Sequence, residues 1–285
     1  MRVALALLSL ISLVFGQSKV ETRELVSSYD SPFRKASALA VGVSGLIYIV
    51  DTGHNRLVAI DSVGSIILES SQGGSEGELR WPVDVTVGAG GRIYVCDSGN
   101  RRIVEYTRLL EWKGELTPAD IDGTALEPRL AAASTVGDIF VFESDNGQLL
   151  RYDSFFKVIA RLGGQTGKTI SNPISMTYST ALGLLWTDRE GMIYRCDEFL
   201  SDPRKYRMIP TAQKFWQIAS VDSVVYAVGD SHIFRQSGST IDSLVWSDVL
   251  SGVNRPAEIR IKSAADGTLY LLNSKRGSLV SLYWP

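Results

Sequence analysis

Four carboxylates that recur at one spacing are the first candidates for chemistry in this sequence. Each ends a short apolar run and precedes a turn-forming segment, at intervals of about 45 residues. The four are Asp51, Asp97, Glu143 and Asp188. A ring of carboxylates could bind a metal ion. Alternatively, each carboxylate closes its own turn and pairs with a nearby arginine, Arg56 or Arg102. Because the four belong to separate repeat units, they should lie too far apart to share an ion, so we expect structural turn residues and no metal there.

Histidine and serine chemistry is sparse. His54 and His232 are the only histidines, and both fall on predicted turns. Two histidines cannot build a histidine-rich metal site. The sequence also has no Gly-x-Ser-x-Gly nucleophile motif. We therefore expect both histidines to be turn residues and expect no catalytic residue.

The segment 82–106 indicates what kind of element carries these residues. It holds three short stretches rich in β-formers, separated by turn-forming runs at 88–91 and 97–100. Such a meander cannot bury both faces alone. Similar apolar runs occur six times, at a period of about 40 to 50 residues, and prolines open several units. This pattern predicts an all-β chain that forms a six-bladed β-propeller of four-stranded blades.

The two ends of the chain are predicted to close the ring. The last unit ends with one strand at 278–283 and lacks a fourth. The segment 22–29 precedes the first full unit and can supply the missing strand. Pairing of the two ends would remove the open sheet edges. The propeller would then occupy residues 17–285 as a single domain.

Residues 1–16 have the composition of a secretory signal peptide, with Arg2 followed by an apolar run that is short for a membrane span. We expect an exported protein, periplasmic or extracellular, with no membrane span in the mature chain. Cys96 and Cys196 fall in units that are not adjacent, so two buried free thiols are expected. The formal net charge of −2, without a basic run, argues against a nucleic-acid partner. A monomer is expected.

The turns after the second strand of the first two units resemble those of the NHL repeat, the turn of the third is recognisably similar, and the last three units resemble it only faintly. The segments are DTGHNRLV at 51–58 and DSGNRRIV at 97–104, and the strands at 82–87 and 91–95 match the opening of the repeat. The resemblance implies a six-bladed propeller. It implies no particular activity, because one fold supports many functions.

Calcium-dependent lactonases of the gluconolactonase type are also six-bladed propellers, and they supply the alternative function. Such enzymes hold one metal at the channel mouth through Glu, Asn and Asp side chains. The candidate channel-mouth oxygens here are Asp84, Asn172 and Glu258, each near the start of an inner strand. That family typically opens its first blade with Glu-Gly-Pro, where this chain has Asp30–Pro32. A calcium-dependent lactonase or ester hydrolase is therefore the second hypothesis.

The segments that enter the inner strands should line the face on which the channel opens. Arg80 and Trp81 stand directly before Pro82, the predicted start of such a strand. The expected binding face comprises Arg80, Trp81, Asp84, Asn172 and Glu258. We expect a non-catalytic module, without a cofactor, that presents this face to a protein, peptide or glycan partner.

Overall fold

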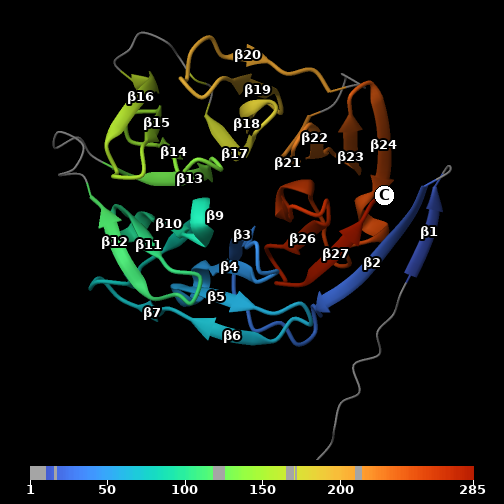
Figure 1. Cartoon of the computed structure of the whole chain (residues 1–285). Coiled ribbons are helices and arrows are strands. Elements are labelled where there is room, and N and C mark those ends of the chain that lie inside the picture. The colour runs from blue at the N-terminus through green and yellow to red at the C-terminus, as the bar shows by residue number, and fades with distance from the viewer. Residues whose placement is uncertain (1–10, 16–17, 118–125, 165–169, 171, 209–213) are drawn as a thin grey trace, which may run out of the picture.

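The computed structural model describes residues 11–15, 18–117, 126–164, 170, 172–208 and 214–285, with side chains from residue 20 onward. Six antiparallel sheets form a ring around a central channel (Figure 1). Each blade has four strands that follow one another from the channel outward. The predicted all-β, six-bladed propeller is confirmed.

The first three blades are regular. Blade 1 consists of β3 (Ala36–Val41), β4 (Ile47–Asp51), β5 (Arg56–Ile60) and β6 (Ile66–Glu69). Blade 2 consists of β9 (Pro82–Val87), β10 (Ile93–Asp97), β11 (Arg102–Tyr106) and β12 (Trp112–Leu116). Blade 3 consists of β13 (Pro128–Ala133), β14 (Ile139–Glu143), β15 (Gln148–Tyr152) and β16 (Val158–Gly163). A short parallel pair, β7 (Ser71–Gln72) and β8 (Glu78–Leu79), lies between blades 1 and 2 in the chain.

The last three blades keep four strands although their sequence repeats are faint. Blade 4 consists of β17 (Pro173–Ser179), β18 (Gly183–Asp188), β19 (Ile193–Cys196) and the two-residue β20 (Arg204–Lys205). Blade 5 consists of β21 (Gln217–Val221), β22 (Val224–Val228), β23 (His232–Ser237) and β24 (Thr240–Val245). Blade 6 combines β25 (Ile259–Ser263), β26 (Leu269–Asn273) and β27 (Leu279–Tyr283) with the N-terminal β2 (Ser18–Val26).

The core is divided among the six junctions between neighbouring blades. Each buried apolar cluster is drawn from two adjacent blades, as in the cluster where Tyr48 of blade 1 meets Val85 of blade 2. The other five clusters fill the remaining junctions in the same way. Cys96 and Cys196 are buried in two different clusters and are free thiols, as predicted. Burial raises the pKa of the Cys196 thiol to about 12, which keeps it protonated and unreactive.

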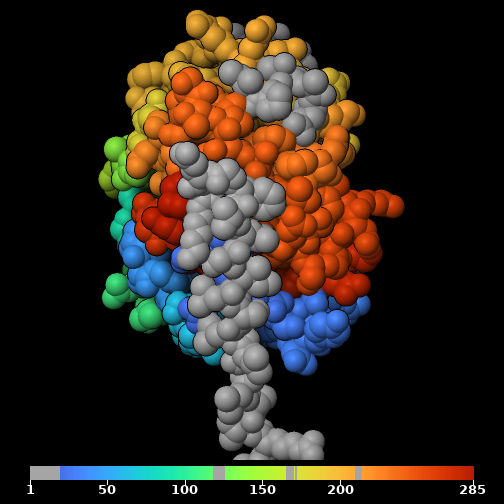
Figure 2. Space-filling view, turned by 90° about the vertical axis from the view of Figure 1, so that its right-hand side faces the viewer, coloured from blue at the N-terminus to red at the C-terminus, as the bar shows by residue number. Residues whose placement is uncertain are grey.

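The ring is closed by pairing of the two ends, as predicted. Strand β2 runs antiparallel to β27, and Figure 2 shows blue N-terminal residues directly beside the red and orange residues of the C-terminal part of the chain. The closing strand spans Ser18–Val26, whereas the sequence suggested 22–29. The predicted and observed ranges overlap at 22–26.

A further strand, β1 (Ile11–Phe15), pairs with β2 outside blade 6. It lies within the segment expected to be a signal peptide. The remaining residues of that segment, including Gly16 at its expected end, lie outside the described residues. Across the described ranges, no helix has the length and apolar character to cross a membrane.

Candidate functional site

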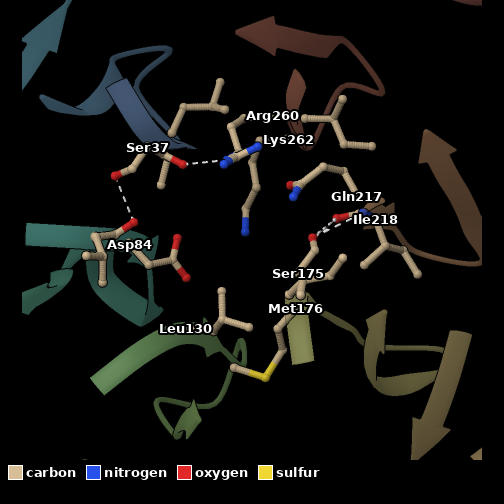
Figure 3. Close-up of a pocket in the computed structure, with 14 residues that line it drawn as sticks. Ser37, Asp84, Leu130, Ser175, Met176, Gln217, Ile218, Arg260 and Lys262 are labelled. Atoms are coloured by element: carbon tan, nitrogen blue, oxygen red, sulfur yellow. Dashed lines mark hydrogen bonds between the residues drawn. The ribbon is translucent and has the colours of Figure 1, made fainter. Parts of the chain in front are cut away.

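The central channel contains a cavity of about 230 Å³ (Figure 3). Its walls come from the inner strand of every blade, mostly from the first half of each strand. Because the six inner strands run in the same direction, their first residues lie at one end of the channel, together with the segments that enter them. The polar side chains on the cavity wall are Ser37, Asp84, Ser175, Gln217, Arg260 and Lys262.

Arg260 is held in place by backbone carbonyls. Its Nε donates to the carbonyl of Ser37 at 2.7 Å, across the junction between blades 6 and 1. Its Nη1 donates to the carbonyls of Ala257 at 2.7 Å and Ile259 at 3.0 Å. The guanidinium therefore joins the last blade to the first, while its charge still faces the channel.

Asp84 and Lys262 point into the cavity from blades 2 and 6 (Figure 3). Asp84 Oδ2 accepts a 2.8 Å hydrogen bond from the backbone N–H of Ala131. Burial raises the pKa of Asp84 to about 6, although the charges of Lys262 and Arg260 oppose the shift. Burial also lowers the pKa of Lys262, and the charge of Asp84 opposes that change. The cavity thus holds one acidic and two basic side chains, and none of their three charges is well solvated.

The three candidate oxygens do not converge. Asp84 lines the cavity, but Asn172 and Glu258 do not. Glu258 instead accepts from the backbone N–H of Asn254 at 3.0 Å and pairs with Lys275 at 3.8 Å. Asn172 is exposed. The single carboxylate in the cavity faces two cationic side chains, and such a donor set does not fit a calcium ion. No group of three His, Cys, Asp or Glu side chains that could hold a metal occurs in the described part of the chain.

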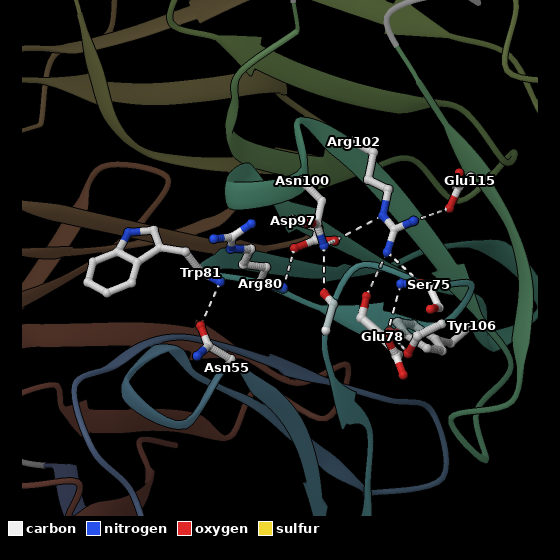
Figure 4. A network of polar contacts seen from close by, with 12 residues as sticks. Asn55, Ser75, Glu78, Arg80, Trp81, Asp97, Asn100, Arg102, Tyr106 and Glu115 are labelled. Atoms are coloured by element: carbon white, nitrogen blue, oxygen red, sulfur yellow. Dashed lines mark hydrogen bonds and ion pairs between the residues drawn. The ribbon is translucent and has the colours of Figure 1, made fainter.

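Arg80 and Trp81 lie outside the cavity, at the end of the channel where the inner strands begin. Trp81 remains 49 % exposed, and Lys35 Nζ lies 5.7 Å from its ring centroid. The backbone of Trp81 has a φ of 49° and donates to Asn55 Oδ1 at 2.8 Å (Figure 4). A left-handed backbone is unfavourable for a bulky side chain. The tryptophan is therefore held in an exposed position at some cost in conformational energy.

The recurring carboxylates bind turns and not one another. Asp97 accepts from the backbone N–H of Arg80 at 2.7 Å, from Asn100 Nδ2 at 2.8 Å and from Arg102 Nε at 3.0 Å (Figure 4). Asp51 repeats this arrangement, with Arg56 Nε at 2.9 Å. Each carboxylate therefore joins its own turn to the segment that enters the same blade.

The pattern is looser in the next two blades. Glu143 accepts from Asn146 Nδ2 at 3.1 Å and from Gln148 Nε2 at 3.3 Å, without an arginine. Asp188 Oδ1 accepts from the backbone N–H groups of Glu190 at 3.0 Å and Met192 at 2.9 Å. These bonds close the local turn in both blades.

The two histidines belong to turns or their edges. His54 Nδ1 lies 2.8 Å from Asp51 Oδ2 within the turn of blade 1. His232 begins β23, and its Nδ1 lies 2.7 Å from the Ser231 hydroxyl. Neither lines the channel cavity.

Sequence reasoning missed Gln217 and Lys262 as cavity residues. A signal was present in blade 6, where Arg260 and Lys262 alternate with apolar residues along β25. Two cations on one inner strand are unusual, because inner strands face their neighbours on both sides. Their position in the channel depends on how the six blades pack around it, which the sequence alone does not specify.

The comparisons with known proteins agree with this architecture. Residues 79–106 match the NHL repeat, which places the repeat in blade 2. No curated protein matches the chain. Similar solved structures include a streptogramin B lyase, with 14 % identity, coverage of 93 % of this chain and 98 % of that one, and a TM-score of 0.61.

Two further structures are similar over nearly the whole chain. An inactive variant of virginiamycin B lyase from Staphylococcus aureus, solved with quinupristin, has 14 % identity, covers 95 % of this chain and 93 % of its own, and gives a TM-score of 0.60. A gluconolactonase from Xanthomonas campestris has 14 % identity, coverage of 95 % and 91 %, and a TM-score of 0.66. Identities this low establish a shared fold and nothing about activity. The chain is thus a six-bladed β-propeller. More particularly, it is one that carries an NHL repeat in its second blade.

The raised pKa of Asp84 predicts a stability change with pH. The unfolded chain releases this proton near the ordinary value of 3.8 and the folded chain near 6, so folding becomes less favourable as pH rises through this window. Asp84→Asn should therefore raise the free energy of unfolding at pH 8, by at most about 3 kcal/mol, and the gain should vanish by pH 4.

Urea denaturation of both proteins at the two pH values measures this difference. Asp197 is the control with the opposite sign, because hydrogen bonds from Ser201 lower the pKa of its carboxyl. Asp197→Asn should lower stability at pH 8, and its effect should fade as pH falls. An Asp84→Asn protein that is less stable than the wild type at pH 8 would contradict the assignment.

Proposed function

We propose that this propeller is an exported, non-catalytic binding module. It presents the channel end where the inner strands begin to a protein, peptide or glycan partner. The observation that carries the proposal is the exposed Trp81, held in a left-handed backbone conformation beside Lys35 at the entrance to blade 2. Strained, exposed aromatic side chains are uncommon away from functional surfaces.

The charge at this end of the ring supports an acidic partner. Exposed cations occupy the segments that enter the inner strands and the turns that pack on those segments. They are Arg34, Lys35, Arg80, Arg101, Arg129, Arg255, Lys275 and Arg276. Three of them pair with carboxylates, namely Asp145, Glu127 and Glu258. The same segments and turns carry fewer exposed carboxylates, at Asp30, Glu76, Asp145, Glu190, Asp230 and Asp248, and this excess of cations would attract an acidic surface.

The alternative, a calcium-dependent lactonase or ester hydrolase, receives less support. The similarity to a gluconolactonase is one of fold. The carboxylate and amide oxygens that such a site would use are separated in this chain, and the one carboxylate in the cavity faces Lys262 and Arg260. We therefore propose binding, and not hydrolysis, as the function of this propeller.

Replacement of Trp81 should remove partner binding while preserving the fold. Asparagine tolerates a left-handed backbone, so Trp81→Asn should fold normally. Immobilised wild type, Trp81→Asn and Phe155→Ala would be incubated with exported proteins from the source cells, and the retained partners compared by mass spectrometry. Phe155 is 88 % exposed in a turn between the third and fourth strands of blade 3, at the other end of the ring, and is the matched control.

The same partner should be retained by the wild type and Phe155→Ala, and its recovery should fall at least about tenfold with Trp81→Asn, as for loss of an aromatic anchor. Equal retention by all three proteins would refute the proposed binding face. Equal loss in both variants would refute it as well, because the effect would then be independent of position.

A further inference from the structure

Lys262 is a cation in the channel without a partner. Its ammonium group points toward the middle of the cavity (Figure 3). Among the described residues, it makes no hydrogen bond, and no carboxylate lies within 4.0 Å of it. A lysine removed from bulk water is normally paired, because burial without a partner disfavours its charged form. An unpaired lysine in a cavity therefore indicates a place for an anionic ligand.

The nearby charged groups are engaged elsewhere. Asp84 attracts Lys262 through space, but its Oδ2 is bound to the backbone N–H of Ala131 and it forms no ion pair with the lysine. Arg260 directs its Nε and Nη1 donors to backbone carbonyls. With all three groups ionised, the cavity carries a net positive charge, and among the described residues Lys262 is the cation that has all of its donors available.

Gln217 supplies a second, independent indication. Its side chain is only 8 % exposed, lines the same cavity and makes no side-chain hydrogen bond to the described residues. Its amide oxygen and nitrogen open onto the cavity, so their hydrogen-bonding groups are available to a ligand. Figure 3 shows its amide and the Lys262 ammonium directed into the same space. One ligand with acceptor oxygens would satisfy both.

The remaining walls restrict the ligand further. Leu39, Leu130, Met176 and Ile218 give the cavity an apolar side. The volume of about 230 Å³ is below the usual range of drug-sized sites, roughly 300 to 1,000 Å³. A short acid with a hydrocarbon body matches this combination of charge, wall and size.

We propose that this cavity binds a carboxylate, with its oxygens accepting hydrogen bonds from the Lys262 ammonium and the Gln217 amide and its hydrocarbon part against Leu130 and Met176. This inference rests on the proposed binding function, because the cavity lies at the end of the channel assigned to the partner. The carboxylate belongs either to a free small acid or to an acidic side chain of a bound peptide.

Isothermal titration calorimetry on the intact protein tests this. The free-acid probe is glutarate, and glutaramide is its uncharged control. The peptide probe is acetylated, amidated tetraglutamate. Wild type is compared with Lys262→Met, with the polar variant Lys262→Gln and with Lys157→Met, which removes an exposed lysine from a turn of blade 3. Thermal melts of each protein establish that it is folded.

Glutarate should bind the wild type and Lys157→Met with equal affinity, and glutaramide should not bind. Both Lys262 variants should weaken glutarate binding at least about tenfold, corresponding to loss of one charged contact. If tetraglutamate displaces glutarate, the natural carboxylate comes from a peptide. If glutarate binds but the peptide does not displace it, the ligand is a free acid.

Two results would overturn the inference. One is the absence of binding by either carboxylate to the wild type, and the other is equal binding by folded Lys262 variants. Neither bears on the partner capture that depends on Trp81. A protein that retains its partner through Trp81 but does not bind glutarate would thus disprove the cavity site alone. Equal retention of the partner by the wild type and Trp81→Asn, with intact glutarate binding, would disprove only the binding face.

Discussion

A chain that begins at Ser27 should lose most of its stability. Without β2, blade 6 keeps three strands, and the ladder between β2 and β27 is gone. Val20 and Val26 are 1 % and 6 % exposed in the closed ring, and burial of each contributes about 1.5 to 3 kcal/mol. With the lost strand pairing and the newly exposed face of β27, we expect a loss of at least about 5 kcal/mol, comparable to the whole stability of many domains.

A chain that begins at Gln17 is the matched control. It lacks the expected signal peptide and β1, but it retains β2 and therefore the ring closure. Its melting temperature should equal that of the full chain. The chain from Ser27 should melt at least about 10 °C lower, or show no cooperative transition. Equal melting of all three proteins would show that the end-to-end pairing does not hold the ring together.

Arg102→Met should be the most damaging single substitution outside the apolar core. The guanidinium is 7 % exposed and bonds Asp97 at 3.0 Å, Glu115 at 2.6 Å, and the carbonyls of Ser75 at 2.8 Å and Glu78 at 2.7 Å (Figure 4). Asp97 is fully buried. Removal of one member of a buried pair leaves the other charge uncompensated, so we expect a loss of about 3 to 5 kcal/mol.

Arg56→Met is the control, because Arg56 occupies the same position in blade 1. It also bonds the recurring carboxylate, at 2.9 Å, but it is 21 % exposed, and its second partner, Glu69, is 56 % exposed. Solvent replaces part of that network, so the loss should be about half as large. Urea denaturation at pH 7 measures both. Equal losses below about 1 kcal/mol would mean that the buried network contributes little.

The pH dependence of the Arg102 effect checks its cause. Burial already raises the pKa of Asp97, and Arg102 opposes that shift. Without the arginine, the pKa of Asp97 should rise further, so protonation can neutralise the buried carboxylate in mildly acidic solution. The destabilisation should therefore be smaller at pH 5 than at pH 7.

The repeat made most of this fold predictable, because the same turn chemistry occurs in blades 1 and 2 and the period of the apolar strands continues through all six. The carboxylate that ends each second strand, at Asp51 and Asp97, fixes both the local turn and the period along the chain. The sequence predicted that an N-terminal strand closes the ring, but it did not give the exact first and last residues of that strand. Its register is set by long-range pairing with β27, which local alternation in the sequence cannot specify.

The site was predictable only in part. Asp84 was identified because it stands two residues after a proline that opens an inner strand. Lys262 and Gln217 were missed because their approach to Asp84 depends on the assembly of blades 2, 5 and 6 around one channel. Glu258 was predicted to lie at the channel mouth with Asp84 only because it is near the start of an inner strand. In the structure, the 3₁₀ turn Pro256–Glu258 keeps Glu258 outside β25, where it pairs with Lys275.

The central claim, that the channel mouth binds anions and does not use calcium, is tested most directly by one thermal-shift experiment. The wild-type protein is melted with glutarate, with calcium and with a chelator. At a glutarate concentration of about 100 times its dissociation constant, binding adds about 2.7 kcal/mol, so the melting temperature should rise by about 5 to 10 °C. Calcium and chelator should leave it unchanged. A melting temperature raised by calcium, lowered by the chelator and indifferent to glutarate would contradict the account.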